Sequence, residues 1–389
     1  MNDTPEIKDI DATMLTGPVR QVLDTPTAEI IQWERDLIRY INTEESSLGL
    51  YRFRGTARVH GQVRPWSVVL KAVRAPIHET EQAFWNYHRR EILAYQDGLL
   101  SELPGGVLAP RCLSISEYSD AICWLWLEDI ADSSNRSWSL DEYQLTARHL
   151  GQFNGAYLVG TPLPNQPWLS RHWLQGWLAH YEKGCQDTLR LVQDKDFWEH
   201  PLLKSAFHRS ITGDVLRLWD SHETLLGVLG QLPQTFCHMD AYRPNLFIRR
   251  NAPGMEQAVA IDWVFAGIGV VGEEIANLLA ASLIWFEYDA AEAGSLDTAL
   301  FSGYVDGLRE AGWKEDSRLA RLGYTAACAL RWGVVGLWWL RSLGSVDEQA
   351  EFEKHWEHPM PELGLQWSRT IYYVLDLAEE AYQLRRTLF

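Results

Sequence analysis

One short region, residues 237–263, constrains this chain more than any other part of it. Residues 246–250 and 257–261 are mostly apolar runs, and the residues between them include a Pro-Gly pair, which favours a turn. We therefore expect an antiparallel hairpin with Asn245 opposite Asp262. In that arrangement, both side chains present oxygen ligands to one divalent cation at the open end of the hairpin.

Asp240 adds a second carboxylate to this region. It precedes Asn245 on a loop that contains Pro244, so its side chain is free to meet a substrate hydroxyl. Phosphoryl transfer requires little covalent chemistry from a protein, because catalysis comes from positioning the nucleophile and neutralising the phosphates with metal and lysine. Two carboxylates and an amide are therefore residue types that suit a phosphoryl-transfer site.

The pattern His-x-Asp-x-x-x-x-Asn at residues 238–245, followed by Ile-Asp-Trp at 261–263, resembles the aminoglycoside phosphotransferase and choline kinase-like family. These enzymes are small-molecule relatives of protein kinases. The resemblance implies that Asp240 is the catalytic base, that Asn245 holds a magnesium ion, and that Asp262 bridges metal to the phosphates. The structural alternative is that the same residues cap a turn and the ends of two strands.

His238 has two interpretations. The resemblance makes it a scaffold residue rather than a proton carrier. The alternative is a hydrolytic metal centre with His238 and Asp240 as ligands, but that requires further histidines or acids at ligand spacing, and the His-x-Asp pattern stands alone. Met239 lies where the family usually carries glycine, a departure that we expect the loop to tolerate.

Lys71 is the candidate for binding phosphates. Residues 50–59 and 66–73 alternate as two strands, and Lys71 is the one cation in the second apolar run. By resemblance to the family, the ammonium of a lysine at this position binds the α- and β-phosphates of a nucleotide. A lysine at a strand edge that extends to water is the alternative.

A partner for Lys71 is expected in the segment that follows. Residues 79–96 have apolar residues at helical spacing and contain no proline. By resemblance to kinases, Glu91 is our choice for the carboxylate that orients Lys71. Glu81 competes for this role, and a solvated helix face is the alternative for both.

The junction between two lobes is expected near residue 128. An apolar strand at residues 121–127 runs directly into the acidic segment Glu128-Asp129-Ile130. In the resembling family, backbone groups of this connection hold adenine, and Glu128 and Ile130 delimit that contact here. The prediction is a nucleotide-binding lobe at residues 1–127 and an acceptor-binding lobe at residues 128–389.

The loop expected to cover the phosphates departs from the family pattern. Such a loop is usually rich in glycine, but residues 42–49 contain one glycine and two acids. Ser46 and Ser47 are the candidates for contacting phosphate through hydroxyls and amides. This loop is the feature that favours a catalytically silent nucleotide-binding module over an enzyme.

The substrate class follows from a short connection. Only residues 263–272 separate Asp262 from the Glu273-Glu274 pair, which leaves no room for a peptide-binding activation segment. We expect a kinase that uses ATP and Mg2+ to phosphorylate a hydroxyl of a small molecule, either an antibiotic or a metabolite. Its acceptor pocket is expected among residues 262–289 and the helices after residue 317.

The tryptophans are unusually numerous, at 19. Trp332 and Trp339 belong to a stripe at helical spacing, which is more often core than ligand site. Several large rings near the acceptor cleft are also suited to form a stacking wall for an aromatic or extended apolar molecule.

The predicted fold class is α+β, a bilobal protein-kinase-like fold. A small N-terminal lobe has an antiparallel sheet and a helix, and a larger C-terminal lobe is mostly helical, because 389 residues exceed the usual size of one core. Beyond the hairpin, helical periodicity is found at residues 140–158, 168–193, 203–229, 273–290, 296–311, 317–343 and 363–387.

Composition restricts the partners. A net charge of -17 argues against nucleic acid and anionic membranes, which need a basic surface. The five scattered cysteines contain no Cys-x-x-Cys pair and are expected to be free thiols in a reducing cytoplasm. No signal peptide is expected at the N-terminus. The most apolar stretch, residues 324–340, is interrupted by Arg331, so no membrane span is predicted.

Overall fold

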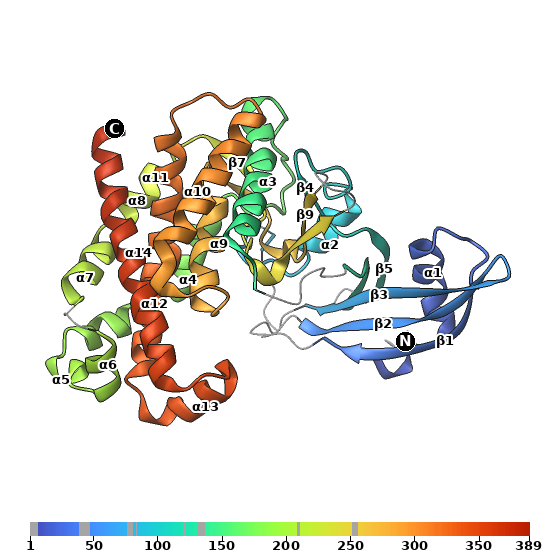
Figure 1. The fold of residues 1–389 in the computed structure, drawn as a ribbon, viewed down its shortest axis with the longest axis horizontal. Coiled ribbons are helices and arrows are strands. Elements are labelled where there is room, and N and C mark those ends of the chain that lie inside the picture. Colours follow the sequence, from blue (N-terminus) through green and yellow to red (C-terminus); the bar gives the residue numbers. More distant parts are fainter. Residues whose placement is uncertain are drawn as a thin grey trace.

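The protein has a small lobe built on a sheet and a larger, mostly helical lobe (Figure 1). A computed structural model describes residues 7–38, 47–75, 81–82, 84–119, 122–130, 137–207, 211–250 and 256–389. The arrangement confirms the predicted α+β, protein-kinase-like fold class. Ser46 and most of the expected phosphate-covering loop lie outside the described residues.

The small lobe contains an antiparallel sheet of five strands in the order β1-β2-β3-β6-β5. Its strands are β1 (Glu29–Leu37), β2 (Ser47–Val59), β3 (Gln62–Arg74), β5 (Cys112–Ser119) and β6 (Ile122–Glu128). Helix α1 (Ala12–Val22) begins at Asp11, whose carboxylate accepts hydrogen bonds from two backbone amides of the first turn. It covers the sheet, and the core between them includes Leu15, Phe53 and Trp126.

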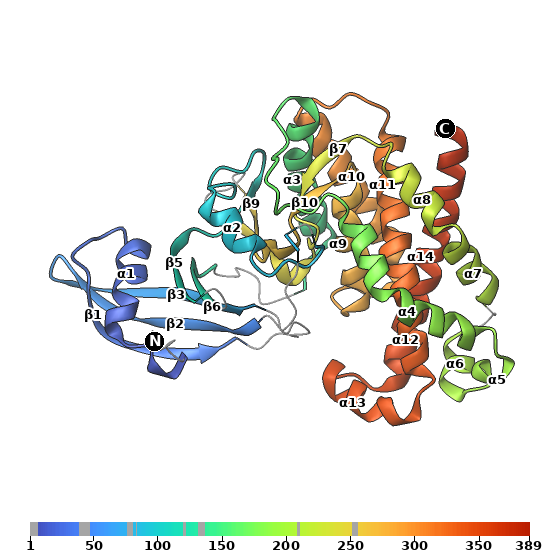
Figure 2. The same ribbon diagram turned by 180° about the vertical axis from the view of Figure 1, so that it is seen from behind.

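Residues 84–108 lie between this sheet and the larger lobe. They contain the short helix α2 (Arg90–Gln96) and strand β4 (Val107–Leu108), which pairs in parallel with β9 (Glu256–Ala260). Seen from behind, α2 and β9 lie close together beside the larger lobe (Figure 2). Trp85, Ala94 and Val107 pack in the hydrophobic core of the larger lobe. The predicted boundary between the two lobes at residue 127 stays a prediction. Residues 84–108, which precede it, pack against the larger lobe.

The larger lobe carries two small β elements. Strand β9 also pairs with β8 (Leu246–Arg250), and β7 (Gln234–Cys237) pairs with β10 (Gly267–Val270). Its helices are α3 (Leu140–Val159), α4 (Trp173–Val192), α5 (Lys195–Trp198), α6 (Pro201–Ala206), α7 (Thr212–Asp220), α8 (His222–Leu229), α9 (Glu273–Ile284), α10 (Ala293–Glu310), α11 (Ser317–Cys328), α12 (Val334–Leu343), α13 (Val346–Trp356) and α14 (Met360–Leu388). A π-helical turn, Ala329–Gly333, joins α11 to α12.

Several predicted helices are shorter than their apolar pattern suggested. The helix expected at residues 79–96 is helical only in α2, since the described residues from 84 to 89 form turns. Trp85 and Tyr87 are apolar there because they fill the larger core, which is a tertiary rather than a helical signal. Similarly, residues 203–229 belong to three helices, α6 to α8, instead of one.

Two other helix boundaries differ from expectation. Helix α4 begins at Trp173 rather than Trp168, because Ser170 forms an isolated bridge with Gly267. Helix α9 ends at Ile284 rather than at residue 290. All five cysteines are free. Within the described part of the chain, no helix has the length and apolarity needed to cross a membrane.

Candidate active site

The hairpin β8–β9 forms as predicted, but its register differs by one residue. Leu246 pairs with Ala260, and the backbone amide of Ile261 donates to the carbonyl of Asn245 at 2.9 Å. Ile261, not Asp262, is therefore opposite Asn245. Asp262 lies one residue further along and has φ 64, a left-handed conformation that turns the chain out of the ladder. Both side chains nevertheless line the same cleft between the lobes.

The ring of His238 ties the loop after β7 to the end of β9. Its Nε2 lies 2.8 Å from the carbonyl oxygen of Ile261, and its Nδ1 accepts a hydrogen bond from the amide of Asp240 at 3.2 Å. Burial lowers the pKa of His238 to about 4. Because both nitrogens of the neutral ring bond to backbone, the geometry favours a scaffold over a metal ligand.

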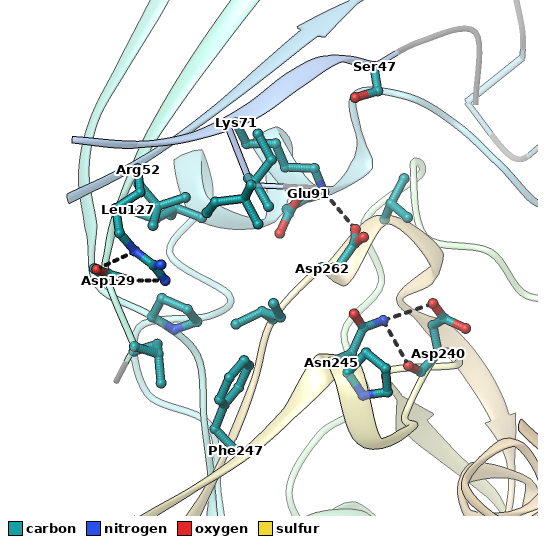
Figure 3. Close-up of a pocket in the computed structure, with 18 of the residues that line it drawn as sticks. Ser47, Arg52, Lys71, Glu91, Leu127, Asp129, Asp240, Asn245, Phe247 and Asp262 are labelled. Atoms are coloured by element: carbon teal, nitrogen blue, oxygen red, sulfur yellow. Dashed lines mark hydrogen bonds and ion pairs between the residues drawn. The ribbon is translucent and has the colours of Figure 1, made fainter. Parts of the chain in front are cut away.

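Three side chains hold the carboxylate of Asp240 (Figure 3 shows Asn245). The amide nitrogen of Asn245 donates to Oδ2 at 2.9 Å. On the other side, Asn277 and Arg331 donate to Oδ1 at 3.1 and 2.9 Å. The carboxylate is therefore fixed in orientation by groups from the hairpin, α9 and the π-helical turn.

Burial and the charge of Arg331 have opposite effects on the pKa of Asp240. Burial raises its pKa to about 6, although Arg331 pulls in the opposite direction, and the nearby carboxylate of Asp262 adds to the increase. A carboxylate with a pKa near 6 is ionised at neutral pH and is still basic enough to accept a proton from a hydroxyl as it reacts.

Glu274, in the first turn of α9, supports the loop that carries Asp240. Its carboxylate accepts hydrogen bonds from the backbone amides of His238 and Met239 at 2.8 and 3.2 Å. Met239 has φ 67, the left-handed conformation that glycine adopts without cost. For a side chain the penalty is about 1 kcal/mol, and Met239 offsets it by burying its side chain. This is how the loop accommodates a residue other than the family's usual glycine.

Lys71 on β3 bridges two carboxylates across the cleft. Its Nζ lies 2.6 Å from Oε2 of Glu91 on α2 and 2.6 Å from Oδ1 of Asp262. Burial works against the charged ammonium, but the two carboxylates outweigh it and raise the pKa of Lys71. Glu91 also accepts from the amide of Trp263 at 3.2 Å, so one carboxylate fixes both the lysine and the segment after Asp262. Figure 3 shows Lys71 extending from the sheet toward Asp262.

The oxygens near this lysine fit a hard divalent cation. The amide nitrogen of Asn245 is held by Asp240, so Oδ1 is the polar atom of Asn245 that remains for a metal. Asp262 receives Lys71 on Oδ1 and retains Oδ2 as a second candidate ligand. Mg2+ usually binds one or two protein oxygens and completes its octahedron with phosphate and water. The donor set is of that kind.

The comparison with protein families identifies the chain. Residues 53–313, about two thirds of the sequence, match the family described as "Phosphotransferase enzyme family". The chain belongs to that phosphotransferase family. Membership confirms the predicted resemblance and makes the protein a small-molecule kinase.

Solved structures agree with this phosphotransferase fold. The chain is 13% identical to a choline kinase from Cryptosporidium parvum Iowa II, with a TM-score of 0.53 and coverage of 96% of this chain and 97% of that one. It is 15% identical to an amicoumacin kinase in complex with AMP-PNP, Ca2+ and Ami, with a TM-score of 0.50 and coverage of 91% and 93%. Among curated proteins, none has significant similarity to the chain.

The segment predicted to hold adenine in this phosphotransferase also lines the cleft, through Glu128, Asp129 and Ile130. The side chain of Glu128 is engaged elsewhere, because it accepts from Arg249 at 2.9 Å and from the amide of Arg111 at 3.2 Å. Any contact of Glu128 with a base is therefore made by its backbone. Ser47, at the start of β2, lines the same cleft.

Sequence reasoning did not assign roles to Arg331 and Asn277. Arg331 had been noted only as the charge that interrupts the most apolar stretch, and that isolation was the available signal. It is buried, and it pairs with Asp240 across 91 positions of sequence. Asn277 gave no signal, since it lies in a helix that is buried almost throughout. The sequence shows the Glu273-Glu274 pair but gives no signal that Glu274 contacts the loop carrying Asp240.

Proposed function

We propose that this phosphotransferase uses ATP and moves the γ-phosphate to a hydroxyl of a small molecule, an antibiotic or a metabolite. The observation that carries the proposal is the convergence of Lys71, Asp240, Asn245 and Asp262 on one cleft. These four side chains come from both lobes and from segments far apart in the sequence, yet each has the chemistry that phosphoryl transfer requires at its place.

Each residue has a separate role in the proposed reaction. Asp240 accepts a hydrogen bond from the acceptor hydroxyl, orients its oxygen for in-line attack and takes its proton. Lys71, oriented by Glu91, binds the α- and β-phosphates. The backbone between Glu128 and Ile130 holds adenine, and Ser46 and Ser47 contact the phosphates.

Asn245 and Asp262 hold the magnesium ion in this proposal. When bound, the ion neutralises charge on the phosphate oxygens during transfer. The protein's own contribution is to present the two oxygens from a rigid hairpin end, where Asn245 is fixed by Asp240 and Asp262 by Lys71.

The direct test measures ADP release from magnesium ATP across a panel of hydroxylated acceptors. Asp240→Asn should lower kcat by about 10²- to 10⁴-fold, the usual contribution of a positioned base, while the dissociation constant for ATP stays similar. Asp141→Asn is the control, because Asp141 is an exposed carboxylate in the first turn of α3. Tight ATP binding without turnover of any acceptor would instead indicate a catalytically silent module.

A further inference from the structure

One face of α9 leads away from Asp240 along the cleft. Asn277, Ala281 and Trp285 follow one another at intervals of four residues, and all three line the cleft. Asn277 touches Asp240 directly, at 3.1 Å. Because a helix rises 1.5 Å per residue, the row from Asn277 to Trp285, the residue that caps α9, is about 12 Å long. It therefore defines one wall of the space that a molecule attached to the reacting hydroxyl occupies.

The π-helical turn supplies a second wall. Arg331 and Trp332 are adjacent in sequence, and both line the cleft. π-helical turns are rare in proteins, but those that occur are often found at functional sites. The guanidinium carbon of Arg331 lies 5.4 Å from the centre of the Trp332 ring, and its Nη2 donates to Asp240. Trp332 therefore contacts Arg331, which in turn contacts the carboxylate of Asp240.

Helix α4 contributes further aromatic rings on the other side of Arg331. The guanidinium lies 5.4 Å from the ring centre of Trp177, which also lines the cleft. Tyr181, one turn later, packs against Trp177 with ring centres 4.5 Å apart and lines the cleft as well. With rings from α9 and from the loop after Asp240, these side chains form what we call the aromatic chamber: Trp177, Tyr181, Tyr242, Trp285 and Trp332.

Charge in the chamber disfavours a cationic acceptor. Arg331 already pairs with Asp240, and Lys71 pairs with Asp262, so neither carboxylate offers an uncompensated negative charge to an ammonium near the reacting hydroxyl. Among the described residues, Glu287 is a further carboxylate that lines the cleft, beyond the end of α9. One further carboxylate cannot pair with every charge of a molecule that carries several ammonium groups.

The cleft is large enough to hold a small-molecule acceptor beside a nucleotide. Its volume is about 1710 Å³, whereas a typical site for one small molecule has roughly 300–1,000 Å³. Rings of tryptophan and tyrosine present flat apolar faces, and flat partners gain stacking energy beyond simple burial.

We propose that the acceptor is an uncharged alcohol that carries a flat aromatic ring close to its hydroxyl, and that the aromatic chamber binds this ring by stacking. This inference rests on the proposed phosphotransfer and names the substrate class of the same site. Amino alcohols and aminosugars, which carry an ammonium near their hydroxyls, are disfavoured because Arg331 already pairs with the Asp240 carboxylate.

The test compares alcohols that differ in their ring with acceptors that carry a positive charge. ADP release is measured with 2-phenylethanol, 2-cyclohexylethanol, 2-(1-naphthyl)ethanol, ethanolamine, choline and kanamycin. We expect the aryl alcohols to exceed the cyclohexyl alcohol and all three cationic acceptors in kcat/KM by at least about tenfold, the equivalent of strong aromatic stacking. Equal rates for the phenyl and cyclohexyl alcohols, or preference for a cationic acceptor, would overturn the inference.

Variants connect that preference to the chamber. Trp332→Leu and Tyr181→Leu should each raise KM for the aryl alcohols roughly fivefold to tenfold, while kcat changes little. Tyr181 is only partly buried, so its variant is informative even if Trp332→Leu folds poorly. The matched control is Trp219→Leu, because Trp219 stacks on His222 outside the cleft and is also partly buried. An unchanged KM in both chamber variants would contradict the inference.

A binding measurement separates failure of this inference from failure of the proposed function. Calorimetric titration of 2-(1-naphthyl)ethanol into the protein with AMP-PNP and Mg2+ does not require turnover. If no acceptor supports ADP release that depends on Asp240, the phosphotransfer proposal fails, but binding that weakens in Trp332→Leu still supports the chamber. If ethanolamine or kanamycin is the preferred acceptor in an Asp240-dependent reaction, phosphotransfer stands and the chamber proposal is wrong.

Discussion

At the scale of single residues, the contact between Arg331 and Asp240 determines how the proposed base behaves. Burial raises the pKa of this carboxylate and the guanidinium counteracts it, so the pKa of Asp240 is about 6. Arg331 is itself held by stacking on Trp173, with its guanidinium carbon 4.3 Å from the ring centre. It also donates to the carbonyl of Met239. We therefore interpret Arg331 as a positioning residue that keeps the base ionised.

The pH dependence of the reaction tests this interpretation. The base must be deprotonated, so kcat/KM should fall as pH decreases through about 6, the pKa of Asp240 in the free enzyme. In Arg331→Gln the positive charge is lost, the pKa of Asp240 rises, and the midpoint of the acid limb should move to higher pH. Arg309→Gln, which removes a guanidinium that packs on Trp313 at the C-terminal end of α10, serves as the control. A lower rate with an unshifted midpoint would indicate a purely structural role.

At the scale of elements, α9 organises the site from its N-terminus. Gly272, with φ 90, caps the helix and lies so close to α11 that an added Cβ would be 2.0 Å from the carbonyl oxygen of Ala320. This tight approach brings the first turn of α9, with Glu274, under the loop that carries Asp240. One turn later the same helix presents Asn277 to Asp240. Helix α9 therefore supports the loop in addition to the contacts that His238 and Asn245 make within it.

Two adjacent glutamates allow this support to be tested. Glu274 is buried and Glu273 is partly buried, and desolvation raises the pKa of each to about 7. Glu274 accepts from the amides of His238 and Met239, whereas Glu273 accepts from the amide of Val270, away from the loop. In Glu274→Gln, an NH2 group replaces one of the two carboxylate oxygens, so one of the two backbone amides loses its acceptor. Leaving that buried amide unpaired costs about 1–3 kcal/mol.

We expect Glu274→Gln to lower kcat roughly tenfold or more, since 1.4 kcal/mol corresponds to a factor of ten. Glu273→Gln, the matched control, should reduce thermal stability to a similar extent but leave kcat close to wild type. Steady-state kinetics and melting temperatures of both variants check this. Equal losses of kcat in the two variants would show that the effect is general destabilisation.

The parts of the site that were predictable are those where a residue contrasts with its surroundings. Lys71 is a single cation in an apolar strand, and Asp240 and Asn245 belong to a polar spacing that hydrophobic packing does not explain. The hairpin register was wrong by one residue because alternation fixes pairing only within the apolar run, whereas Asp262 leaves the ladder in a left-handed conformation. The contact of Arg331 with Asp240 joins residues 91 positions apart, and such a contact has no periodic signal.

At the scale of the whole molecule, Arg90 joins the segment between the lobes to the active site. It is fully buried beside Glu91 and donates to the carbonyls of Trp85 and Val264 at 2.9 and 2.7 Å, and to Trp168 at 2.8 Å. Val264 follows Asp262 by two residues. One guanidinium thus connects α2, the entry to α4 and the segment after the proposed metal ligand, with no carboxylate as partner in these bonds.

Replacing Arg90 should therefore affect the entire molecule. Arg90→Lys keeps the charge but cannot span several carbonyls with one nitrogen, so it leaves buried acceptors unpaired and a buried charge poorly solvated. We expect the free energy of unfolding to fall by about 3–5 kcal/mol, in the range found when a buried charged contact is broken. Arg89→Lys is the neighbouring control, because Arg89 pairs with the half-exposed Glu117 and should change stability by less than about 1 kcal/mol. Urea denaturation followed by circular dichroism measures both, and equal midpoints for the two variants would show that the lobes are held together by their apolar contacts instead.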